Sequence, residues 1–297
     1  MTENKQHRSG FVNIIGNPNV GKSTLMNAMV GEKLSIVTAK AQTTRHRIMG
    51  IVNGEDYQIV YSDTPGILKP NYRLQKNMMN FVDTAIGDAD IILYVTDTVE
   101  TADKNSEYVE KLSKLECPVV VVVNKIDISD QQKVVELMDY WKAQVPKATV
   151  IPASAQEKFN LESIFETIVG LLPVCPPWYD KDAFTDKNLR FFAQEIIREK
   201  ILLNYSQEIP YCCEVNVESF KEGEQRYDIS AVIYVTRDSQ KGIIIGKKGE
   251  ALKKVGTQAR IDMEEFFQKK VFLSLYVKVD ADWRENRREL RKFGYEE

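Results

Sequence analysis

The sequence predicts an α/β fold, a doubly wound mixed sheet, followed by a smaller α+β domain. In the first part of the chain, short apolar runs typical of buried strands alternate with segments of helical periodicity. A proline-dense stretch then interrupts this pattern, and beyond it helices frame strands of alternating polar and apolar residues. We therefore expect one domain at residues 1–173, a semi-rigid linker at 174–187 and a second domain at 188–297.

The elements of the first domain follow from runs of residue types. An Asn53-Gly54 pair between two β-rich runs predicts a hairpin, and the uninterrupted apolar run Pro118–Val123 is typical of a central parallel strand. Further strands are expected at Phe11–Ile15, Ile48–Val52, Tyr57–Ser62, Asp90–Thr96 and Thr149–Ala155. Helices are expected at Thr24–Val30, Ser106–Leu115, Asp130–Gln144 and Leu161–Leu172. Because such sheets bind ligands at the carboxyl edge of their strands, we look for the site in the loops there.

The first of these loops is Gly16-Asn-Pro-Asn-Val-Gly-Lys-Ser23, which reads G-x-x-x-x-G-K-S. A strand before it and a helix after it are the context of a phosphate-binding loop. Its glycines allow successive N–H groups to face phosphate oxygens, and the helix N-terminus adds further donors. In such a loop, Lys22 reaches the β- and γ-phosphates and the Ser23 hydroxyl binds Mg²⁺. A ligand-free glycine turn is the alternative, which the matching flanks disfavour.

A polar segment, residues 31–47, follows the first helix and predicts a mobile loop. It contains Thr43 and Thr44, and a threonine hydroxyl that closes over Mg²⁺ and the γ-phosphate is half of a nucleotide switch. Ordinary threonines in a solvated loop are the alternative. The position between the phosphate loop and the next strand favours the switch.

Asp63-Thr-Pro-Gly66 ends the next strand. We expect Asp63 to hold Mg²⁺ through a water and the Gly66 N–H to meet the γ-phosphate, with a second mobile segment at Ile67–Arg73. Ras-like enzymes place a glutamine directly after this glycine to orient the attacking water. Here Ile67 takes that position. We therefore expect slow intrinsic hydrolysis, or a water positioned by another group.

Asn124-Lys-Ile-Asp127 follows the central apolar strand and predicts guanine as the base. Asp127 can accept from N1–H and the N2 amine of guanine, whereas adenine would leave the carboxylate unpaired. Asn124 is expected to bond the purine edge and the neighbouring loop, and the Lys125 stem to lie over the ring. The backbone of Ser154-Ala155, after the last strand, is placed to contact the guanine carbonyl.

In the second domain, the sequence predicts an α-β-β-α-α-β-α order. Helices are expected at Leu189–Asn204, Glu250–Phe267 and Trp283–Phe293, and strands at Cys213–Phe220, Tyr227–Val235 and Val271–Val279. Gly246-Lys-Lys-Gly249 lies between two helices and follows three isoleucines. A G-x-x-G loop in this frame is typical of KH domains, where it clamps about four nucleotides of single-stranded RNA or DNA. Lys253 and Lys254 are expected to extend its basic rim.

The composition is that of a globular chain: 43% hydrophobic, 28% charged, with a net charge of −3. No apolar run approaches the ~20 residues of a spanning helix, and residues 1–8 lack a hydrophobic signal segment. The 4 cysteines form no C-x-x-C pair, and the 2 histidines lie in polar stretches. We expect reduced, buried thiols, no histidine metal site and a cytoplasmic location. The adjacent Cys212 and Cys213 are expected to point to opposite faces of a strand.

Together these motifs resemble the Era family, KH-domain-containing small GTPases of ribosome assembly in the Era-like branch of TRAFAC GTPases. The resemblance covers nearly the whole chain, and its most specific part is Ala41-Gln-Thr-Thr-Arg-His-Arg47 joined to a KH tail. It implies GTP hydrolysis, a type II KH fold, and binding near the 3′ end of the small-subunit (16S-type) rRNA. It also implies a role in maturation of the small ribosomal subunit.

The resemblance also assigns residues. It implies that Ser23 and Thr44 hold Mg²⁺, together with Asp63, and that Asn19 confers a K⁺ dependence on hydrolysis. Lys22, Thr44 and Gly66 are expected to be catalytic. The expected GTP-binding residues are Gly16, Asn17, Pro18, Asn19, Val20, Gly21, Lys22, Ser23, Thr24, Asp63, Thr64, Pro65, Gly66, Asn124, Lys125, Asp127, Ser154 and Ala155. The expected RNA-binding residues are Gly246, Lys247, Lys248 and Gly249.

The partners expected are GTP or GDP, small-subunit rRNA and the small ribosomal subunit, with the chain mostly a monomer. Some family members associate peripherally with the inner membrane, although this sequence has no lipidation motif and no long basic amphipathic helix. Our interpretation is an RNA-binding GTPase whose nucleotide state is coupled to RNA binding. Two alternatives stay open: an RNA-binding assembly factor with incidental GTP turnover, and a membrane-associated signalling GTPase.

Overall fold

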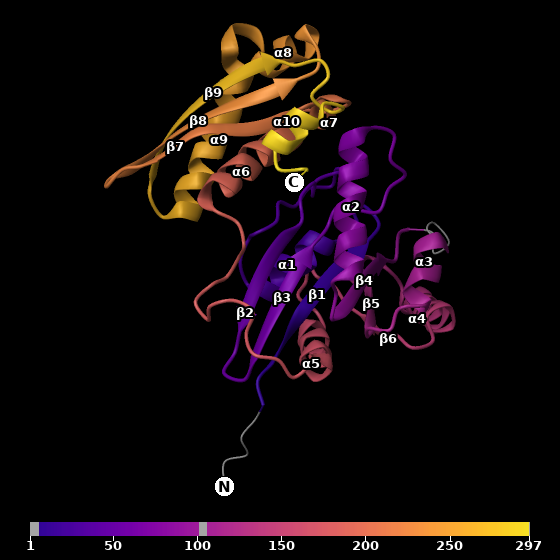
Figure 1. The fold of residues 1–297 in the computed structure, drawn as a ribbon. Helices are drawn as coiled ribbons and strands as arrows, with labels where there is room; N and C mark the ends of the chain where they lie inside the picture. Colours follow the sequence, from indigo (N-terminus) through magenta and orange to yellow (C-terminus); the bar gives the residue numbers. More distant parts are fainter. Residues whose placement is uncertain (1–5, 101–105, 297) are drawn as a thin grey trace. The chain divides into compact units, whose positions relative to one another are not determined.

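The computed structural model describes residues 6–100 and 106–296. Residues 1–5, part of the N-terminal stretch in which we expect no signal segment, lie outside the described residues. The chain folds into two compact units (Figure 1). The first contains the described residues up to Ser35 together with Thr44–Lys69 and Met78–Asp186. The second contains the described residues from Lys187 onward and two segments from earlier in the chain, Ile36–Thr43 and Pro70–Asn77.

The first unit is built on a six-stranded sheet with the order β2-β3-β1-β4-β5-β6. Its strands are β1 (Arg8–Gly16), β2 (Ile48–Asn53), β3 (Tyr57–Asp63), β4 (Ile91–Asp97), β5 (Val119–Asn124) and β6 (Thr149–Pro152). All neighbours pair in parallel except β2, which pairs antiparallel with β3. The expected mixed, doubly wound sheet is therefore confirmed. The expected hairpin is present, but Asn53 belongs to β2 rather than to the turn, so residues 54–56 connect the two strands.

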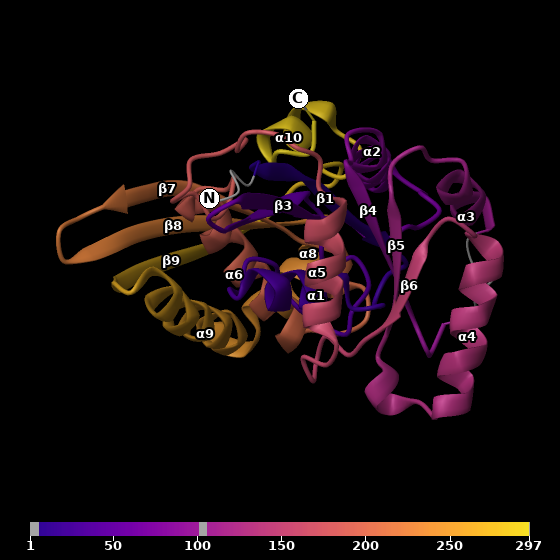
Figure 2. The same cartoon turned by 90° about the horizontal axis from the view of Figure 1, so that it is seen from below.

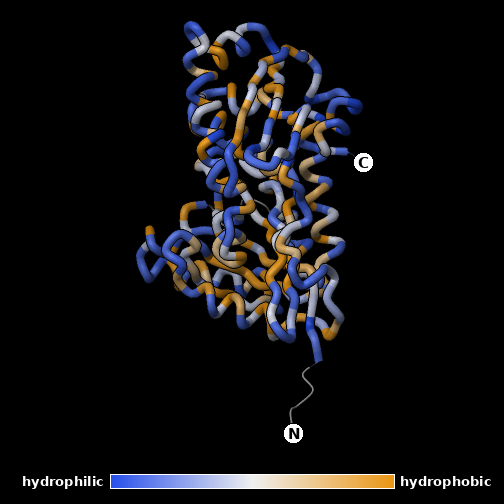
Figure 3. Tube along the Cα trace, turned by 90° about the vertical axis from the view of Figure 1, so that its left-hand side faces the viewer, coloured by the Kyte–Doolittle hydropathy of each residue, from blue (hydrophilic) through white to orange (hydrophobic). Residues whose placement is uncertain are grey.

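Helices cover both faces of this sheet, with α1 and α5 on one face and α2, α3 and α4 on the other (Figure 2). Their bounds are α1 (Lys22–Val30), α2 (Arg73–Gly87), α3 (Ser106–Ser113), α4 (Gln131–Gln144) and α5 (Leu161–Leu171). Strands β4 and β5 are buried along their whole length, as their apolar runs predict. Hydrophobic stretches accordingly run through the interior of the unit (Figure 3). Helix α4 begins where Asp130 accepts a hydrogen bond from the Lys133 N–H.

The proline-dense segment packs along the first unit. The Ser9 hydroxyl donates to the Pro176 carbonyl at 2.6 Å, and the Ile51 N–H donates to the Phe184 carbonyl at 2.9 Å. The Gln58 side-chain oxygen accepts from the N–H groups of Trp178 and Tyr179. This segment is therefore tied by hydrogen bonds to three strands of the sheet, β1, β2 and β3, which fits the semi-rigid character expected of it.

The second unit contains a three-stranded sheet of order β7-β8-β9, with β8 antiparallel to β7 and parallel to β9. Its strands are β7 (Glu214–Glu222), β8 (Arg226–Val235) and β9 (Lys270–Val279). Its helices are α6 (Leu189–Asn204), α7 (Ile209–Cys212), α8 (Asp238–Ile245), α9 (Glu250–Phe267) and α10 (Arg287–Lys292). One face of the sheet packs on α6 and α9 around a core that includes Ile197, Ala231, Val255 and Met263. No helix of the described residues is long and apolar enough to cross a membrane.

Two expectations for this unit are wrong. Cys212 and Cys213 do not lie on opposite faces of a strand, because Cys212 ends helix α7; both thiols donate to the Ile209 carbonyl, at 3.2 and 2.9 Å. The last helix begins only at Arg287, because the Trp283 side chain is buried and its ring N–H donates to the Cys212 carbonyl. All four cysteines are free, as expected, but only Cys212 and Cys213 are buried, whereas Cys117 and Cys175 are partly exposed.

Candidate functional site

The phosphate loop connects β1 to α1 at the carboxyl edge of the first sheet. Gly21 has a positive φ of 97°, and a Cβ there would lie 2.2 Å from the Asn124 side-chain nitrogen. Only glycine fits this backbone so close to a second loop. Helix α1 begins at Lys22, so its first N–H groups are free of helix partners at the loop. This arrangement favours an anion.

Lys22 is buried inside the loop and donates to the Asn17 carbonyl at 2.8 Å. Burial lowers the pKa of Lys22 to about 8, while the nearby carboxylates of Asp63 and Glu100 act in the opposite direction. A buried ammonium whose pKa is lowered by desolvation is stabilised by an anion brought against it. The loop therefore presents a cation that a phosphate group would stabilise.

Three oxygen-bearing side chains meet beside Lys22. The Ser23 hydroxyl lies 2.8 Å from the Thr44 hydroxyl and donates to Asp63 Oδ2 at 2.6 Å, and Thr44 also donates to that oxygen at 3.2 Å. Burial raises the pKa of Asp63, and Lys22 and the hydroxyl hydrogen bonds oppose this shift. Oδ1 of Asp63 is buried and has no well-formed hydrogen bond to any described residue. Hydroxyl and carboxylate oxygens so gathered are hard ligands that fit Mg²⁺.

Asn124 ties three loops together at the end of β5. Its amide N–H₂ donates to the Val20 carbonyl at 2.8 Å, and its oxygen accepts from the Ala155 N–H at 2.9 Å. The expected bond to the neighbouring loop is therefore present. Lys125, in a left-handed conformation with φ 60°, reaches across the phosphate loop to the Asn19 carbonyl at 2.6 Å.

Asp127, the last residue of the Asn124–Asp127 motif, is exposed, as a group that reads a base edge must be. The Ser154 hydroxyl accepts from the Glu157 N–H at 3.1 Å, which fixes the turn that presents Ala155. The structure thus brings the phosphate loop, Asn124, Lys125 and Ser154-Ala155 to one edge of the sheet.

Two acidic residues were missed in the sequence. Asp97, the last residue of β4, pairs with Lys125 at 2.6 Å and so holds the stem of that lysine. Glu100 accepts from Asn17 at 2.5 Å and from the Thr96 hydroxyl at 2.8 Å. Asp97 could have been found in the sequence from its place at the end of an apolar strand run. Glu100 could have been found only from its proximity to the end of that strand.

The Asp63–Gly66 segment is anchored to the first strand. The Thr64 hydroxyl donates to the Ile14 carbonyl at 2.7 Å, and the Ile67 N–H donates to the Gly16 carbonyl at 3.1 Å. The Ile67 side chain is only 4% exposed. It is part of the core here, so its contribution is packing rather than contact with water.

The G-x-x-G loop joins α8 to α9 in the second unit. Gly246 has φ 72°, and a Cβ there would come within 2.6 Å of the Ala251 Cβ. Lys247 and Lys248 are exposed, and α9 begins at Glu250. The loop therefore exposes two ammonium groups on a tight backbone turn, which suits a nucleic-acid backbone that passes close by.

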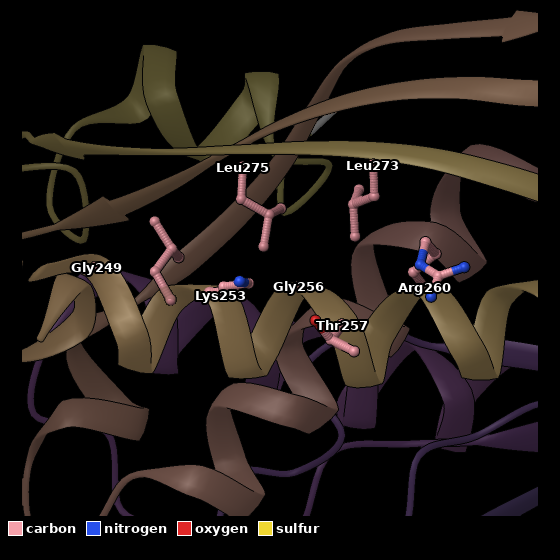
Figure 4. Close-up of a pocket in the computed structure, with 8 residues that line it drawn as sticks. Gly249, Lys253, Gly256, Thr257, Arg260, Leu273 and Leu275 are labelled. Atoms are coloured by element: carbon pink, nitrogen blue, oxygen red, sulfur yellow. The ribbon is translucent and has the colours of Figure 1, made fainter.

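A groove of about 360 Å³ runs from this loop between α9 and β9. Leu273 and Leu275 project from β9 across the groove toward α9 (Figure 4). The lining residues are Gly249, Leu252, Lys253, Gly256, Thr257, Arg260, Leu273 and Leu275. Lys253 lines the groove, whereas Lys254 is exposed on the adjacent face of α9 and is not among the lining residues. That both lysines extend the basic rim of the loop stays a prediction. Arg260, two turns beyond Lys253, was missed.

Fold and site together define a class: a phosphate-loop GTP-binding unit with a guanine-reading motif, joined to a KH unit with an open groove. Comparison with known proteins agrees. Residues 11–125 match the family described as 50S ribosome-binding GTPase, and residues 208–284 match the KH domain family.

Full-length relatives make the assignment more specific. The chain is 44% identical over 298 residues to GTPase Era of Geotalea uraniireducens, with 100% of each chain covered. It is 45% identical over 294 residues to the chloroplastic GTPase ERA1 of Zea mays, covering 97% of this chain and 71% of that relative. The chain belongs to the Era family of GTPases.

Solved structures agree with this assignment. A point variant of Aquifex aeolicus Era bound to GDP.AlF4- superposes with a TM-score of 0.93 at 38% identity, covering 98% of this chain and 100% of that one. An Era in complex with MgGDPNP and nucleotides 1506–1542 of 16S ribosomal RNA gives a TM-score of 0.94 at 38% identity, with the same coverage.

Proposed function

We propose that this chain hydrolyses GTP and binds small-subunit rRNA near its 3′ end during assembly of the small ribosomal subunit. The observation that carries the proposal is the convergence of Ser23, Thr44 and Asp63 beside a buried Lys22. The relative bound to MgGDPNP and to nucleotides 1506–1542 of 16S rRNA supports both ligands.

In this proposal, Ser23 and Thr44 hold Mg²⁺ through their hydroxyls and Asp63 holds it through a water. Bound Mg²⁺ supplies a Lewis acid that offsets charge on the β- and γ-phosphate oxygens. Lys22 and the loop N–H groups stabilise the negative charge that develops as water attacks the γ-phosphate. The Gly66 N–H contacts the γ-phosphate, so Lys22, Thr44 and Gly66 form the proposed catalytic set.

Guanine selection falls to Asn124, Lys125 and Asp127, with the Ser154-Ala155 backbone at the base carbonyl. The full GTP-binding set proposed is the one expected from the sequence. We also propose that K⁺ stimulates hydrolysis through Asn19, as the family resemblance implies. Hydrolysis rates in matched K⁺ and Na⁺ buffers test this, and equal rates would exclude it.

RNA is proposed to bind along the groove, with Gly246, Lys247, Lys248 and Gly249 at the phosphates. The groove is open to solvent, with an apolar wall on β9 and basic side chains on α9. Such a groove suits a single strand whose bases lie against the apolar wall and whose backbone lies at the basic rim. The domain assignment proposed stays 1–173, 174–187 and 188–297.

Nucleotide state and RNA binding are proposed to be coupled through α6. Inside the second unit, Arg198 of α6 donates to the Thr43 carbonyl, one residue before the Mg²⁺ ligand Thr44. The Lys40 ammonium donates to the carbonyls of Leu202 and Tyr205 at the end of the same helix. The expected switch loop is thus bonded to α6 at both ends of its Lys40–Thr43 segment.

The same helix end also contacts α8, the helix that leads into the G-x-x-G loop. The Tyr205 hydroxyl donates to the Ile244 carbonyl at 2.7 Å, two residues before Gly246. A change in the position of Thr44 on nucleotide binding therefore reaches the G-x-x-G loop through one helix and four hydrogen bonds. For binding equilibria such coupling must be reciprocal, so RNA changes nucleotide affinity by the same factor.

The experiment measures GTP hydrolysis with and without a single-stranded RNA carrying the small-subunit rRNA 3′ end, in K⁺ buffer. The control is the double variant Gly246→Asp, Gly249→Asp. We expect RNA to stimulate hydrolysis in the parent chain and not in the variant. Tight RNA binding with an unchanged rate would instead favour an assembly factor with incidental turnover.

Location and assembly state complete the proposal. We propose a cytoplasmic protein, mostly monomeric, that acts on the small subunit where ribosomes assemble. The peripheral membrane contact implied by the family resemblance is tested by flotation with anionic vesicles. Vesicle binding without RNA binding would favour the signalling alternative.

A further inference from the structure

The outward side of β9 carries a row of exposed aromatic side chains. Side chains alternate along a strand, so Leu273 and Leu275 line the groove while Phe272 and Tyr276 point to the opposite face of the sheet. Phe272 is 54% exposed and Tyr276 is 59% exposed. Both exposed rings therefore lie on the same face of one strand.

Basic side chains flank these rings. The Arg226 guanidinium lies 5.4 Å from the centre of the Phe272 ring, and Lys278 lies 5.8 Å from that of Tyr234. Asp228 is on the same face and pairs with Arg226 at 3.1 Å. The side chains on this face of β9, at alternate positions from 270 to 278, are Lys, Phe, Ser, Tyr and Lys. The two aromatic residues therefore lie between two cationic residues.

We propose that this face, formed by Arg226, Phe272, Ser274, Tyr276 and Lys278, binds a second stretch of the same RNA by base stacking. We call it the β9 outer face. The inference rests on the proposed RNA binding in the groove. It goes beyond that proposal, because these side chains lie on the other side of the strand.

Continuity with the groove identifies the occupant. β9 is an edge strand of the described sheet, so no further strand separates its two sides. An RNA strand that leaves the groove over this edge meets Phe272 and Tyr276 next. At the far end of the face, α10 closes the sheet, where Phe293 packs on Tyr234 with ring centres 5.2 Å apart.

The chemistry of the face suits single-stranded RNA. Phe272 and Tyr276 are four residues apart, about 13 Å along a strand, so each ring takes a separate base. Ser274 between them is small and leaves room for the connecting backbone. Arg226 and Lys278 lie at the two ends, where phosphates would pass. Stacking on aromatic faces tolerates any base, so we expect affinity without sequence preference here.

The test compares two RNAs on the full-length chain by fluorescence anisotropy. The short RNA has about four nucleotides, enough for the groove alone. The long RNA adds about eight nucleotides of arbitrary sequence. The variants are Phe272→Leu with Tyr276→Leu, which keeps apolar bulk, and Phe272→Tyr with Tyr276→Phe, which keeps both rings. Val135→Ser, an exposed apolar residue of α4, is the control.

We expect the double leucine variant to lose about tenfold or more in affinity for the long RNA and to bind the short RNA as the parent does. The ring-preserving variant and the Val135→Ser control should match the parent on both RNAs. Equal affinity of parent and leucine variant for the long RNA would overturn the inference while leaving groove binding intact. If the parent binds neither RNA, the proposed RNA function fails as well. If the leucine variant changes only self-association in sedimentation, the face is an interface between two copies and the inference is wrong.

Discussion

The nucleotide site and the RNA groove differ in how far their side chains are buried and hydrogen-bonded before a ligand binds. The nucleotide site is buried, and its side chains are already hydrogen-bonded. Lys22, Ser23, Thr44 and Asp63 come from three segments and contact one another or the loop. The groove is open, and its cationic side chains are exposed or half-exposed on one helix and one loop. A ligand of fixed shape binds well to a site whose groups are already held in position. A flexible strand needs an accessible surface instead.

Loss of the phosphate-loop lysine is the largest effect that this comparison predicts. Lys22→Met should lower the rate of single-turnover GTP hydrolysis by about 10²–10³, because a positioned cation at the developing charge is removed. The matched control is Lys247→Met, a lysine of the other glycine loop, which should hydrolyse GTP as the parent does. If both variants lost the hydrolysis rate to a similar extent, the assignment of GTP hydrolysis to the first site alone would be wrong.

The two regions should also differ in their response to pH. Lys22 has a pKa lowered to about 8 by burial, and bound phosphate raises it again. Below that pKa the lysine is already protonated. Above it, binding must take up a proton, so GDP affinity should fall by up to tenfold per pH unit between about 8 and 10. Isothermal titration at several pH values measures the GDP affinity. An affinity that does not change with pH over that range would contradict a lowered pKa of Lys22.

Substitutions in the groove should give smaller, additive losses. Lys253→Ala and Arg260→Ala should each weaken RNA binding several-fold and reduce the salt dependence of log K by about 0.7, as expected for one phosphate contact on a single strand. Basal GTP hydrolysis should not change. Lys254→Ala, on the adjacent helix face, is the control. An equal effect of Lys254→Ala would place the RNA on another side of α9.

The smallest effect concerns the residue after Gly66. Since Ile67 is buried, Ile67→Gln should not create a water-positioning group, and hydrolysis should not rise. The buried amide should instead lower the free energy of unfolding by about 1–3 kcal/mol. Urea denaturation and single-turnover hydrolysis test both statements. A clear rate increase would show that this side chain reaches the attacking water.

The sequence predicted what depends on contiguous residues. The phosphate loop, Asn124-Lys-Ile-Asp127 and the G-x-x-G turn are each one short stretch at an element boundary, where backbone geometry and chemistry are set locally. The doubly wound sheet was predictable because alternating strands and helices connect with one handedness.

Residues whose roles depend on distant partners could not be predicted. Asp97 and Glu100 matter because the ends of β4 and β5 and the phosphate loop meet at one edge. Arg260 matters because β9 packs opposite α9. That residues 36–43 fold with the second unit depends on hydrogen bonds between residues more than 150 apart in sequence, such as that from Arg198 to Thr43. No local pattern encodes such a pairing.

The proposed coupling between the nucleotide site and the RNA groove predicts that RNA affinity depends on which nucleotide is bound. We would measure binding of the rRNA 3′-end RNA to the full-length chain with GDP and with MgGDPNP, for the parent, Lys40→Ala and the control Lys69→Ala. We expect the parent and the control to bind RNA with different affinities in the two states, and Lys40→Ala to bind equally in both. An unchanged nucleotide dependence in Lys40→Ala, or none in the parent, would contradict coupling through α6.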